Sequence, residues 1–306
     1  MRQPSRKHHP RIRAAAVSCA LPFLLLVPTS ASAAIGDVWD HGPGGERYVA
    51  IGDSAASGPV IPIQRTDPIS CLRSDHNFPT VAAQTLGVTA FRDVTCSSAT
   101  TAHMYTAQGD NIPQLDALGR DTTLVTLGPI GANDFNLVGV GIGCINPAPP
   151  GTGTSCKEGF EADGSDPNVE TIRALRPVLA KIVRDVHRRA PRANVLVVGY
   201  GQYFTPGGCW PIVPLWPEDA DYIQGLVDRL DAGLKRAARR NDATYVSLQQ
   251  EDALDHTMCA LPGAQWITQL VDPLNGLGVL AHPTALGMAN FGRFVAEETE
   301  KRDERH

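Results

Sequence analysis

Short runs of apolar and β-branched residues recur along the chain and predict buried strands. A weak run covers Val88–Val94. Four stronger runs have the same character: Arg47–Ile51, Thr122–Leu127, Asn194–Val198 and Ala243–Ser247. We therefore expect five strands.

The segments between these runs place apolar residues at helical spacing. The longest apolar stripe, in Val169–Arg189, has a basic outer face, and Pro177 inside it predicts a kink or a restart of the helix. Asn146–Asp166 is rich in glycine and proline and predicts a loop. Helices are expected at four places: Phe78–Leu86, Val169–Arg189, Ala220–Arg239 and Ala285–Lys301.

Strands that alternate with helices of this length favour a parallel sheet with helices on both faces. With five strands, we predict a flavodoxin-like doubly wound sheet, which is a three-layer α/β/α fold. Ligands of such sheets bind outside the carboxyl ends of the strands. Sequence on both sides of the loop at 146–166 is of the same kind, so we expect a single domain from residue 34 to residue 306.

The first 33 residues have the layout of a secretory signal peptide. Residues 1–13 carry five basic side chains and no acidic one, and Ala14–Val27 is apolar. Ala31-Ser32-Ala33 is a small-x-small cleavage site. The apolar segment is shorter than a membrane-spanning helix. We therefore predict cleavage after Ala33 and a secreted protein that is not stably inserted in a membrane.

Cleavage at this point would remove five positive charges and change the formal net charge from −5 to −10. Such an acidic surface repels phosphate backbones, so we expect no nucleic-acid partner. Six of the seven cysteines follow the cleavage site, and an even number in an exported protein favours disulfides. No Cys-x-x-Cys or His-x-x-x-His spacing is present, which argues against a zinc site. We also expect no other metal or cofactor, and we expect a monomer.

Three polar residues follow predicted strands, at the edge where ligands of this fold bind. Ser54 comes just after the first strand, Asn133 follows Thr122–Leu127, and His282 precedes the last helix. A serine nucleophile needs a base and donors for the developing oxyanion, and these three side chains can supply them. Taken singly, each has a plainer interpretation as a turn or helix-cap residue. Their order along the chain favours the catalytic interpretation.

The motifs around these residues resemble the sequence blocks of the SGNH, or GDSL, hydrolases. The resemblance extends from about Arg47 to about Gly292 and is nearest to the secreted actinobacterial esterases and lipases. It implies a flavodoxin-like α/β/α fold and hydrolysis of carboxylic esters, with Ser54 as nucleophile and His282 as base. Four blocks carry it: Gly52-Asp53-Ser54, Cys96-Ser97-Ser98-Ala99, Gly131-Ala132-Asn133-Asp134 and His282-Pro283.

The resemblance also implies an oxyanion hole made by the backbone N–H groups of Ser54 and Ser98 and the side chain of Asn133. The family normally has glycine at the position of Ser98, but serine retains the backbone N–H that this position contributes. From the residues alone, six cysteines allow 15 pairings. The resembling proteins pair theirs sequentially, which implies three disulfides: Cys71–Cys96, Cys144–Cys156 and Cys209–Cys259.

The group that orients His282 has two interpretations. Many members of the family carry Asp three residues before the histidine, where this chain has Val279. Some actinobacterial members use a backbone carbonyl instead, and we expect a carbonyl near Val279 to do so here. The alternative is Asp272, which would reach the histidine if its loop folded back.

The sequence leaves the substrate open among short-chain esters, long-chain lipids, phospholipids and acetylated glycans. The predicted function is a secreted serine ester hydrolase acting on an ester or lipid, and the rival is a non-catalytic binding protein for cell-wall glycan or lipid. Five aromatic residues either cover the sheet edge or wall an apolar acyl or alcohol site: Tyr200, Tyr203, Phe204, Trp210 and Trp216.

Overall fold

The computed structural model describes residues 46–269 and 279–303. The described part of the chain contains a five-stranded parallel sheet in the order β2-β1-β3-β4-β5. This is the flavodoxin-like order, so the predicted fold is confirmed. The strands are β1 (Arg47–Ile51), β2 (Ala90–Asp93), β3 (Leu124–Leu127), β4 (Asn194–Val198) and β5 (Thr244–Val246).

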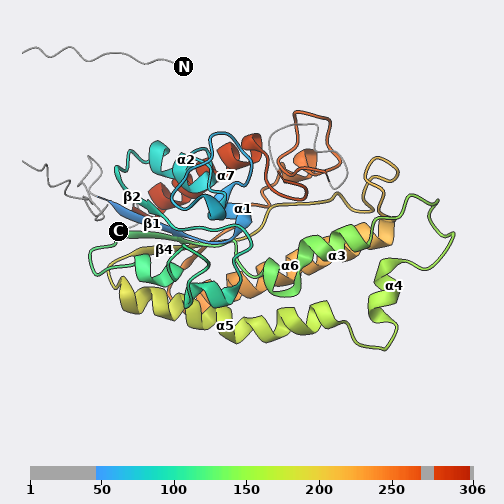
Figure 1. Ribbon diagram of the computed structural model, residues 1–306, viewed down its shortest axis with the longest axis horizontal. Coiled ribbons are helices and arrows are strands. Elements are labelled where there is room, and N and C mark those ends of the chain that lie inside the picture. The colour runs from blue at the N-terminus through green and yellow to red at the C-terminus, as the bar shows by residue number, and fades with distance from the viewer. Residues whose placement is uncertain (1–45, 270–278, 304–306) are drawn as a thin grey trace, which may run out of the picture. The chain divides into compact units, whose positions relative to one another are not determined.

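Helices cover both faces of the sheet, as Figure 1 shows. The helices α2 and α7 pack together on one face, and α5 and α6 pack together on the other, where α3 also lies. The α-helices of the described residues are α1 (Ser54–Ser57), α2 (Phe78–Thr85), α3 (Leu137–Gly143), α4 (Cys156–Glu161), α5 (Pro167–Arg189), α6 (Pro217–Arg240) and α7 (Ala285–Asp303).

The centre of the sheet is apolar and closely packed. Every residue of β3 is buried, and so are the last four residues of β1 and of β4. The hydroxyl of Tyr48 pairs with Oγ1 of Thr126 on the neighbouring strand at 2.8 Å, so these buried polar atoms are satisfied. Burial on both faces explains why these strands are continuous apolar runs in the sequence.

Two helical segments differ from the sequence prediction. α5 is a single helix through Pro177, whose ring is exposed, so that the carbonyl lacking an N–H partner can bond to water. The loop predicted over 146–166 is wrong for Cys156–Glu161, which forms α4. Ser155 and Glu158 start this helix with a reciprocal capping box, a signal that the glycines and prolines around it obscured.

Three disulfides connect the loops of the structure, and their pairs are those implied by the resemblance: Cys71–Cys96, Cys144–Cys156 and Cys209–Cys259. The pairs close segments of 25, 12 and 50 residues. In the chain-entropy view, each such cross-link stabilises the fold by roughly 3–4 kcal/mol through the unfolded state.

No helix in the described ranges is long and apolar enough to cross a membrane. The predicted signal peptide, residues 1–33, lies outside the described residues, as does Asp272. The division of the chain at residue 33 therefore stays a prediction.

The carboxyl ends of β1 and β3 approach each other closely, and this contact shapes the nucleophile loop. A Cβ added to Gly52 would lie 3.0 Å from the carbonyl oxygen of Gly128. Gly128 itself has φ +104, and a Cβ there would lie 2.6 Å from the carbonyl oxygen of Val198. Only glycine fits at these two positions, because any side chain would push the loops apart. The chain order reverses between β1 and β3, which is where doubly wound sheets form their ligand crevice.

Candidate active site

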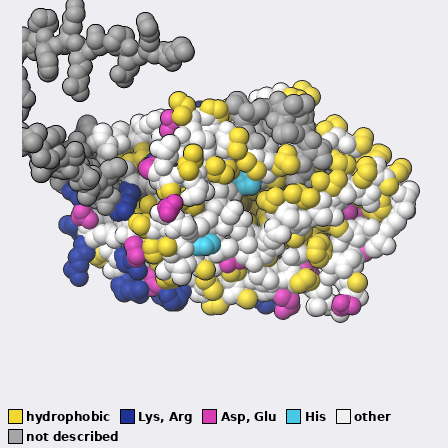
Figure 2. Space-filling model, in the orientation of Figure 1, with side chains coloured by type: hydrophobic (Ala, Val, Ile, Leu, Met, Phe, Trp, Pro, Cys, Tyr) yellow, Lys and Arg dark blue, Asp and Glu magenta, His cyan; other side chains and the backbone are white. Residues whose placement is uncertain are grey.

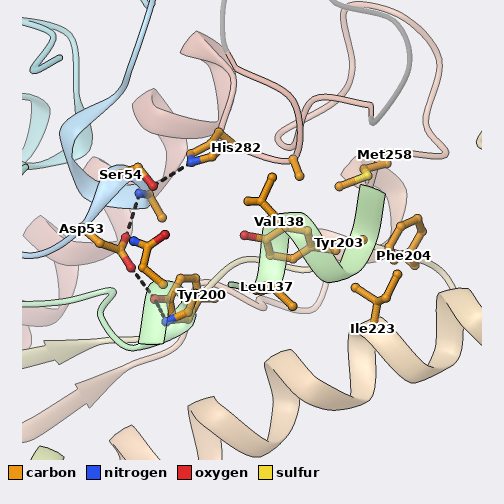
Figure 3. A pocket seen from close by; sticks show the side chains of 15 residues that line it. Asp53, Ser54, Leu137, Val138, Tyr200, Tyr203, Phe204, Ile223, Met258 and His282 are labelled. Atoms are coloured by element: carbon orange, nitrogen blue, oxygen red, sulfur yellow. Dashed lines mark hydrogen bonds between the residues drawn. The ribbon is translucent and has the colours of Figure 1, made fainter. Parts of the chain in front are cut away.

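Ser54 begins α1 directly after β1, and its side chain contacts a histidine from the far end of the chain. The carboxylate of Asp53 caps this short helix by accepting from the N–H of Ala55 at 2.9 Å. Oγ of Ser54 lies 2.7 Å from Nε2 of His282, as Figure 3 shows. Each of the two residues is only 9% exposed. The nucleophile and base expected from the sequence are therefore in hydrogen-bond contact.

The ring of His282 is held from its other nitrogen by the main chain. Nδ1 lies 2.8 Å from the carbonyl oxygen of Leu280, so Nδ1 carries the proton and Nε2 is free to accept. The backbone N–H of His282 donates to the carbonyl of Val279 at 3.1 Å, which fixes the turn. Burial lowers the pKa of His282 below its ordinary value, and the hydrogen bond to Leu280 opposes this shift. The ring therefore stays neutral at neutral pH.

Three groups are the expected oxyanion donors beside Ser54. The amide of Asn133 donates one N–H to the carbonyl of Ala99 at 2.9 Å, which orients the side chain and leaves the second N–H available. The backbone N–H groups of Ser54 and Ser98 have no partner among the described residues. Ser98 adopts φ 64, the left-handed conformation that glycine has at low cost. Asn133 lines the pocket at Ser54, whereas Ser98 is not among its lining residues.

The loops that carry these donors are tied to each other. Asp134 accepts from the N–H of Thr101 at 3.0 Å and from its hydroxyl at 2.6 Å. These two bonds join the loop after β3 to the loop after β2. Together with the bond from Asn133 to Ala99, these contacts hold the two loops in a fixed position relative to each other.

A buried tyrosine, which the sequence indicated only as an aromatic near the sheet edge, joins the nucleophile loop to the Asn133 loop. The hydroxyl of Tyr200 donates to Oδ2 of Asp53 and accepts from the N–H of Ala132 at 3.0 Å. Its own N–H donates to Asp231 at 2.9 Å. Burial raises the pKa of Asp53 to about 7, against the opposing hydrogen bonds from Tyr200 and Ala55. Tyr200 thus sets the distance between the two loops.

An apolar pocket extends from Ser54 and His282 along α3, as Figure 3 shows. Its space measures about 490 Å³, part of which is open to solvent. The five aromatics named from the sequence divide here. Tyr200, Tyr203 and Phe204 line the pocket, whereas Trp210 and Trp216 do not. Trp216 is buried, and its ring N–H donates to the carbonyl of Ala148 at 2.8 Å. The apolar wall consists of Leu137, Val138, Gly141, Phe204, Ile223 and Met258.

The surroundings of the pocket differ from those of the opposite end of the molecule. In Figure 2, hydrophobic side chains spread over the end that holds α3 and α4, whereas Lys and Arg gather at the other end. Among the described residues, no group of three or more His, Cys, Asp or Glu side chains could hold a metal ion. The polar side chains that line the pocket are Asp53, Ser54, Asn133, Tyr200, Tyr203 and His282.

Fold and site together define a class: a doubly wound α/β/α protein with a Ser–His pair at the carboxyl edge of its sheet. The comparison with protein families names it, because residues 50–289 match the GDSL-like lipase/acylhydrolase family. The chain belongs to this family. The protein is therefore a carboxylic ester hydrolase.

Individual relatives agree with this assignment. The chain is 36% identical to Lipase 2 of Streptomyces coelicolor over 262 residues, which cover 82% of this chain and 84% of the relative. The structure of an extracellular lipase from Streptomyces rimosus matches with a TM-score of 0.67 at 25% identity, covering 83% of this chain and 99% of the lipase. A phospholipase A1 from Streptomyces albidoflavus shares the fold, with a TM-score of 0.64 at 24% identity over 82% and 98% of the two chains.

Proposed function

We propose that the protein is a secreted serine esterase or lipase that works through an acyl-enzyme on Ser54, with His282 as the general base. The observation that carries the proposal is the 2.7 Å contact between Oγ of Ser54 and Nε2 of His282, in which Nδ1 is already occupied by Leu280. A hydroxyl becomes a useful nucleophile when an oriented base can take its proton. The ester hydrolase activity of the family gives this pair its reaction.

In the acylation step, Nε2 of His282 takes the proton of Ser54 while Oγ forms a bond to the ester carbonyl carbon. The carbonyl oxygen becomes an oxyanion, which the N–H groups of Ser54 and Ser98 and the amide of Asn133 would stabilise. The C–O bond to the alcohol then breaks, and the histidine returns its proton to the leaving oxygen. A water molecule repeats the sequence on the acyl-enzyme and releases the acid.

The apolar pocket supplies the binding site for the hydrophobic part of the ester. Its wall is aliphatic and aromatic, and its polar groups are concentrated at the Ser54 end. Burial of each CH₂ of a chain contributes about 0.8 kcal/mol, so an acyl chain gains affinity with length until the pocket is filled. We infer that the acyl chain lies along α3, against Leu137 and Val138 and toward Met258.

Export is part of the proposal. It is supported by the predicted signal peptide, by three disulfides of a kind that persist in oxidising compartments, and by the extracellular relative from Streptomyces rimosus. Amino-terminal sequencing of protein recovered from the culture medium should begin at Ala34. Recovery of the chain only inside cells, with Met1 intact, would contradict export.

The catalytic assignment is tested with Ser54→Ala and a matched control on the same helix. Ser57 is also buried in α1, but its hydroxyl pairs with that of Ser97 at 3.0 Å and does not line the pocket. Ser54→Ala should lower the hydrolysis of para-nitrophenyl butanoate by several powers of ten, while Ser57→Ala retains at least about a tenth of the activity. Retention of more than about a tenth by Ser54→Ala would refute the assignment, since that loss is only ~1.4 kcal/mol. Wild-type protein without esterase activity would favour the binding-protein alternative.

A further inference from the structure

The hydroxyl groups of the tyrosines are paired with one exception. The chain has six tyrosines, all within the described ranges, and five of them bond a protein group through the hydroxyl. The exception is Tyr203, whose hydroxyl has no partner among the described residues. Tyr203 is only 6% exposed as a residue, but its hydroxyl is not one of the fully enclosed side-chain atoms without a partner, so this oxygen is accessible from the pocket that Tyr203 lines.

The backbone of Tyr203 is fixed on both sides. Its N–H donates to the side chain of Gln224 on α6 at 2.9 Å, and its carbonyl accepts from the N–H of Met258 at 3.0 Å. Gln224 is in turn held by Asp228 at 2.8 Å. The residue is therefore held in a preset position, and its hydroxyl is the polar group that has no partner among the described residues.

This hydroxyl points into the active-site pocket. Tyr203 lines the same pocket as Ser54 and His282. In Figure 3 its ring lies beside Val138, with the oxygen directed to the side on which Ser54 and His282 lie. The rest of the wall next to it is apolar, so Tyr203 brings a hydroxyl donor to this part of the wall.

The hydroxyl keeps its proton under all working conditions. Burial raises the pKa of Tyr203 above its ordinary value, and the carboxylates of Asp53 and Asp231 add to the shift. A protonated phenol at this place can donate to an oxygen of a bound molecule. Pocket recognition of this kind combines a large apolar wall with few, well-placed polar groups.

We propose that the Tyr203 hydroxyl is a specificity-determining donor, which selects esters carrying a second acceptor oxygen close to the scissile carbonyl over plain alkyl esters. The substrate class would be an oxygenated amphiphilic ester, with the oxygen on either its acyl or its alcohol part. The proposal rests on the proposed function only in that the pocket at Ser54 binds the substrate. An ester with the oxygen satisfies the donor, whereas an alkyl ester leaves it buried and unpaired.

The test uses substrate pairs that differ by one CH₂-to-O exchange. On the acyl side, para-nitrophenyl hexanoate is compared with para-nitrophenyl propoxyacetate. On the alcohol side, hexyl butanoate is compared with 2-propoxyethyl butanoate. For each pair, kcat/KM of the oxygenated ester is divided by that of the alkyl ester, and this ratio is measured for wild type and Tyr203→Phe. Comparing the enzymes cancels the intrinsic reactivity of the esters.

We expect Tyr203→Phe to lower the ratio about five- to tenfold for one of the two pairs, with no loss on the plain alkyl esters. Which pair responds tells whether the oxygen belongs to the acyl or the alcohol part. Tyr222→Phe is the matched control, because its hydroxyl bonds Asn168 at 2.9 Å and does not line this pocket. It should leave both ratios unchanged.

Two outcomes would overturn the proposal. Ratios within twofold of wild type for both pairs would show that the hydroxyl does not contact the substrate. An equal loss on all four esters would make Tyr203 an oxyanion donor instead. Thermal unfolding adds an independent check: Tyr203→Phe should unfold within about 3 °C of wild type, since no protein hydrogen bond is removed. These outcomes are separate from the Ser54→Ala test, which asks whether the pocket is catalytic.

Discussion

Nδ1 of His282 lies 2.8 Å from the carbonyl oxygen of Leu280, a main-chain group two residues before it. In a Ser-His-Asp triad this position belongs to a carboxylate, which fixes the tautomer and stabilises the imidazolium. A carbonyl oxygen imposes the same tautomer, because it can only accept. It carries no full charge, so it stabilises the imidazolium less. The geometry fits the carbonyl interpretation, with Leu280 as the particular residue.

The first prediction concerns the alternative carboxylate, Asp272. Because Leu280 already occupies Nδ1, Asp272→Asn should retain more than about a tenth of wild-type kcat. Loss of a triad carboxylate costs about 10⁴ in the serine proteases. Steady-state kinetics on para-nitrophenyl butanoate, with circular dichroism to verify folding, makes the measurement. A loss above about a hundredfold in folded Asp272→Asn would mean that the carboxylate is a third catalytic member.

The pH dependence of kcat/KM provides the second prediction. Burial lowers the pKa of His282 below 6.5, so the neutral base persists as the pH falls below that value. Activity should therefore stay level from pH 7 to below pH 6.5 and fall as the pH drops through the lowered pKa. Asp53, with a pKa of about 7, also titrates in this range, so the profile is repeated with Asp53→Asn. An acid limb centred at or above 6.5 in both proteins would contradict the account.

The fold could be predicted from the sequence because its strands and long helices have strong local patterns. β1 and β4 are continuous apolar runs, and α6 has a clear apolar stripe. α3 could not be predicted, because glycine occupies three of its seven positions and glycine is a poor helix former. It forms because Leu137 and Val140 are buried against the rest of the molecule.

The candidate site was predictable only in part, because local sequence patterns indicate where strands and helices lie but not which side chains meet. Ser54, Asn133 and His282 stand next to elements whose order can be deduced, and parallel strands bring their carboxyl ends to one edge. The partner of Nδ1 depends on a turn, and the pairing of Tyr200 with Asp53 joins residues 147 positions apart. The spacing of apolar residues along the sequence does not indicate either of these two contacts. The aromatic residues after β4 were visible, but the division of their roles required their positions.

Asn133 provides the third prediction. One N–H of its amide is fixed by the carbonyl of Ala99, which leaves the other for the oxyanion. Asn133→Ala should lower kcat by about 10²–10³ with little change in KM, as expected for a donor used mainly in the transition state. Asn133→Asp is the matched variant, because it keeps the size and loses the donor, and it should be equally impaired. Wild-type kcat in Asn133→Ala would leave Asn133 as a turn residue.

Tyr200 is a positioning residue, and Tyr200→Phe is the fourth prediction. The change removes the donor to Asp53 and the acceptor of the Ala132 N–H. The free energy of unfolding should fall by about 1–3 kcal/mol. Because small displacements of reacting groups are costly, kcat should fall about ten- to a hundredfold while KM changes little. Denaturant unfolding and steady-state kinetics measure the two effects. Lower stability with unchanged kcat would make the role of Tyr200 structural only.

The central claim, an acyl-enzyme on Ser54 activated by His282, is tested most directly by trapping the nucleophile. Wild-type protein is treated with an alkyl fluorophosphonate, and the adduct is located by intact mass and by peptide mapping. The account predicts one equivalent of phosphonate on Ser54 together with loss of esterase activity, no adduct in Ser54→Ala, and much slower labelling of His282→Ala. Inactivation with the phosphonate on another residue, or esterase activity that survives complete labelling of Ser54, would contradict it.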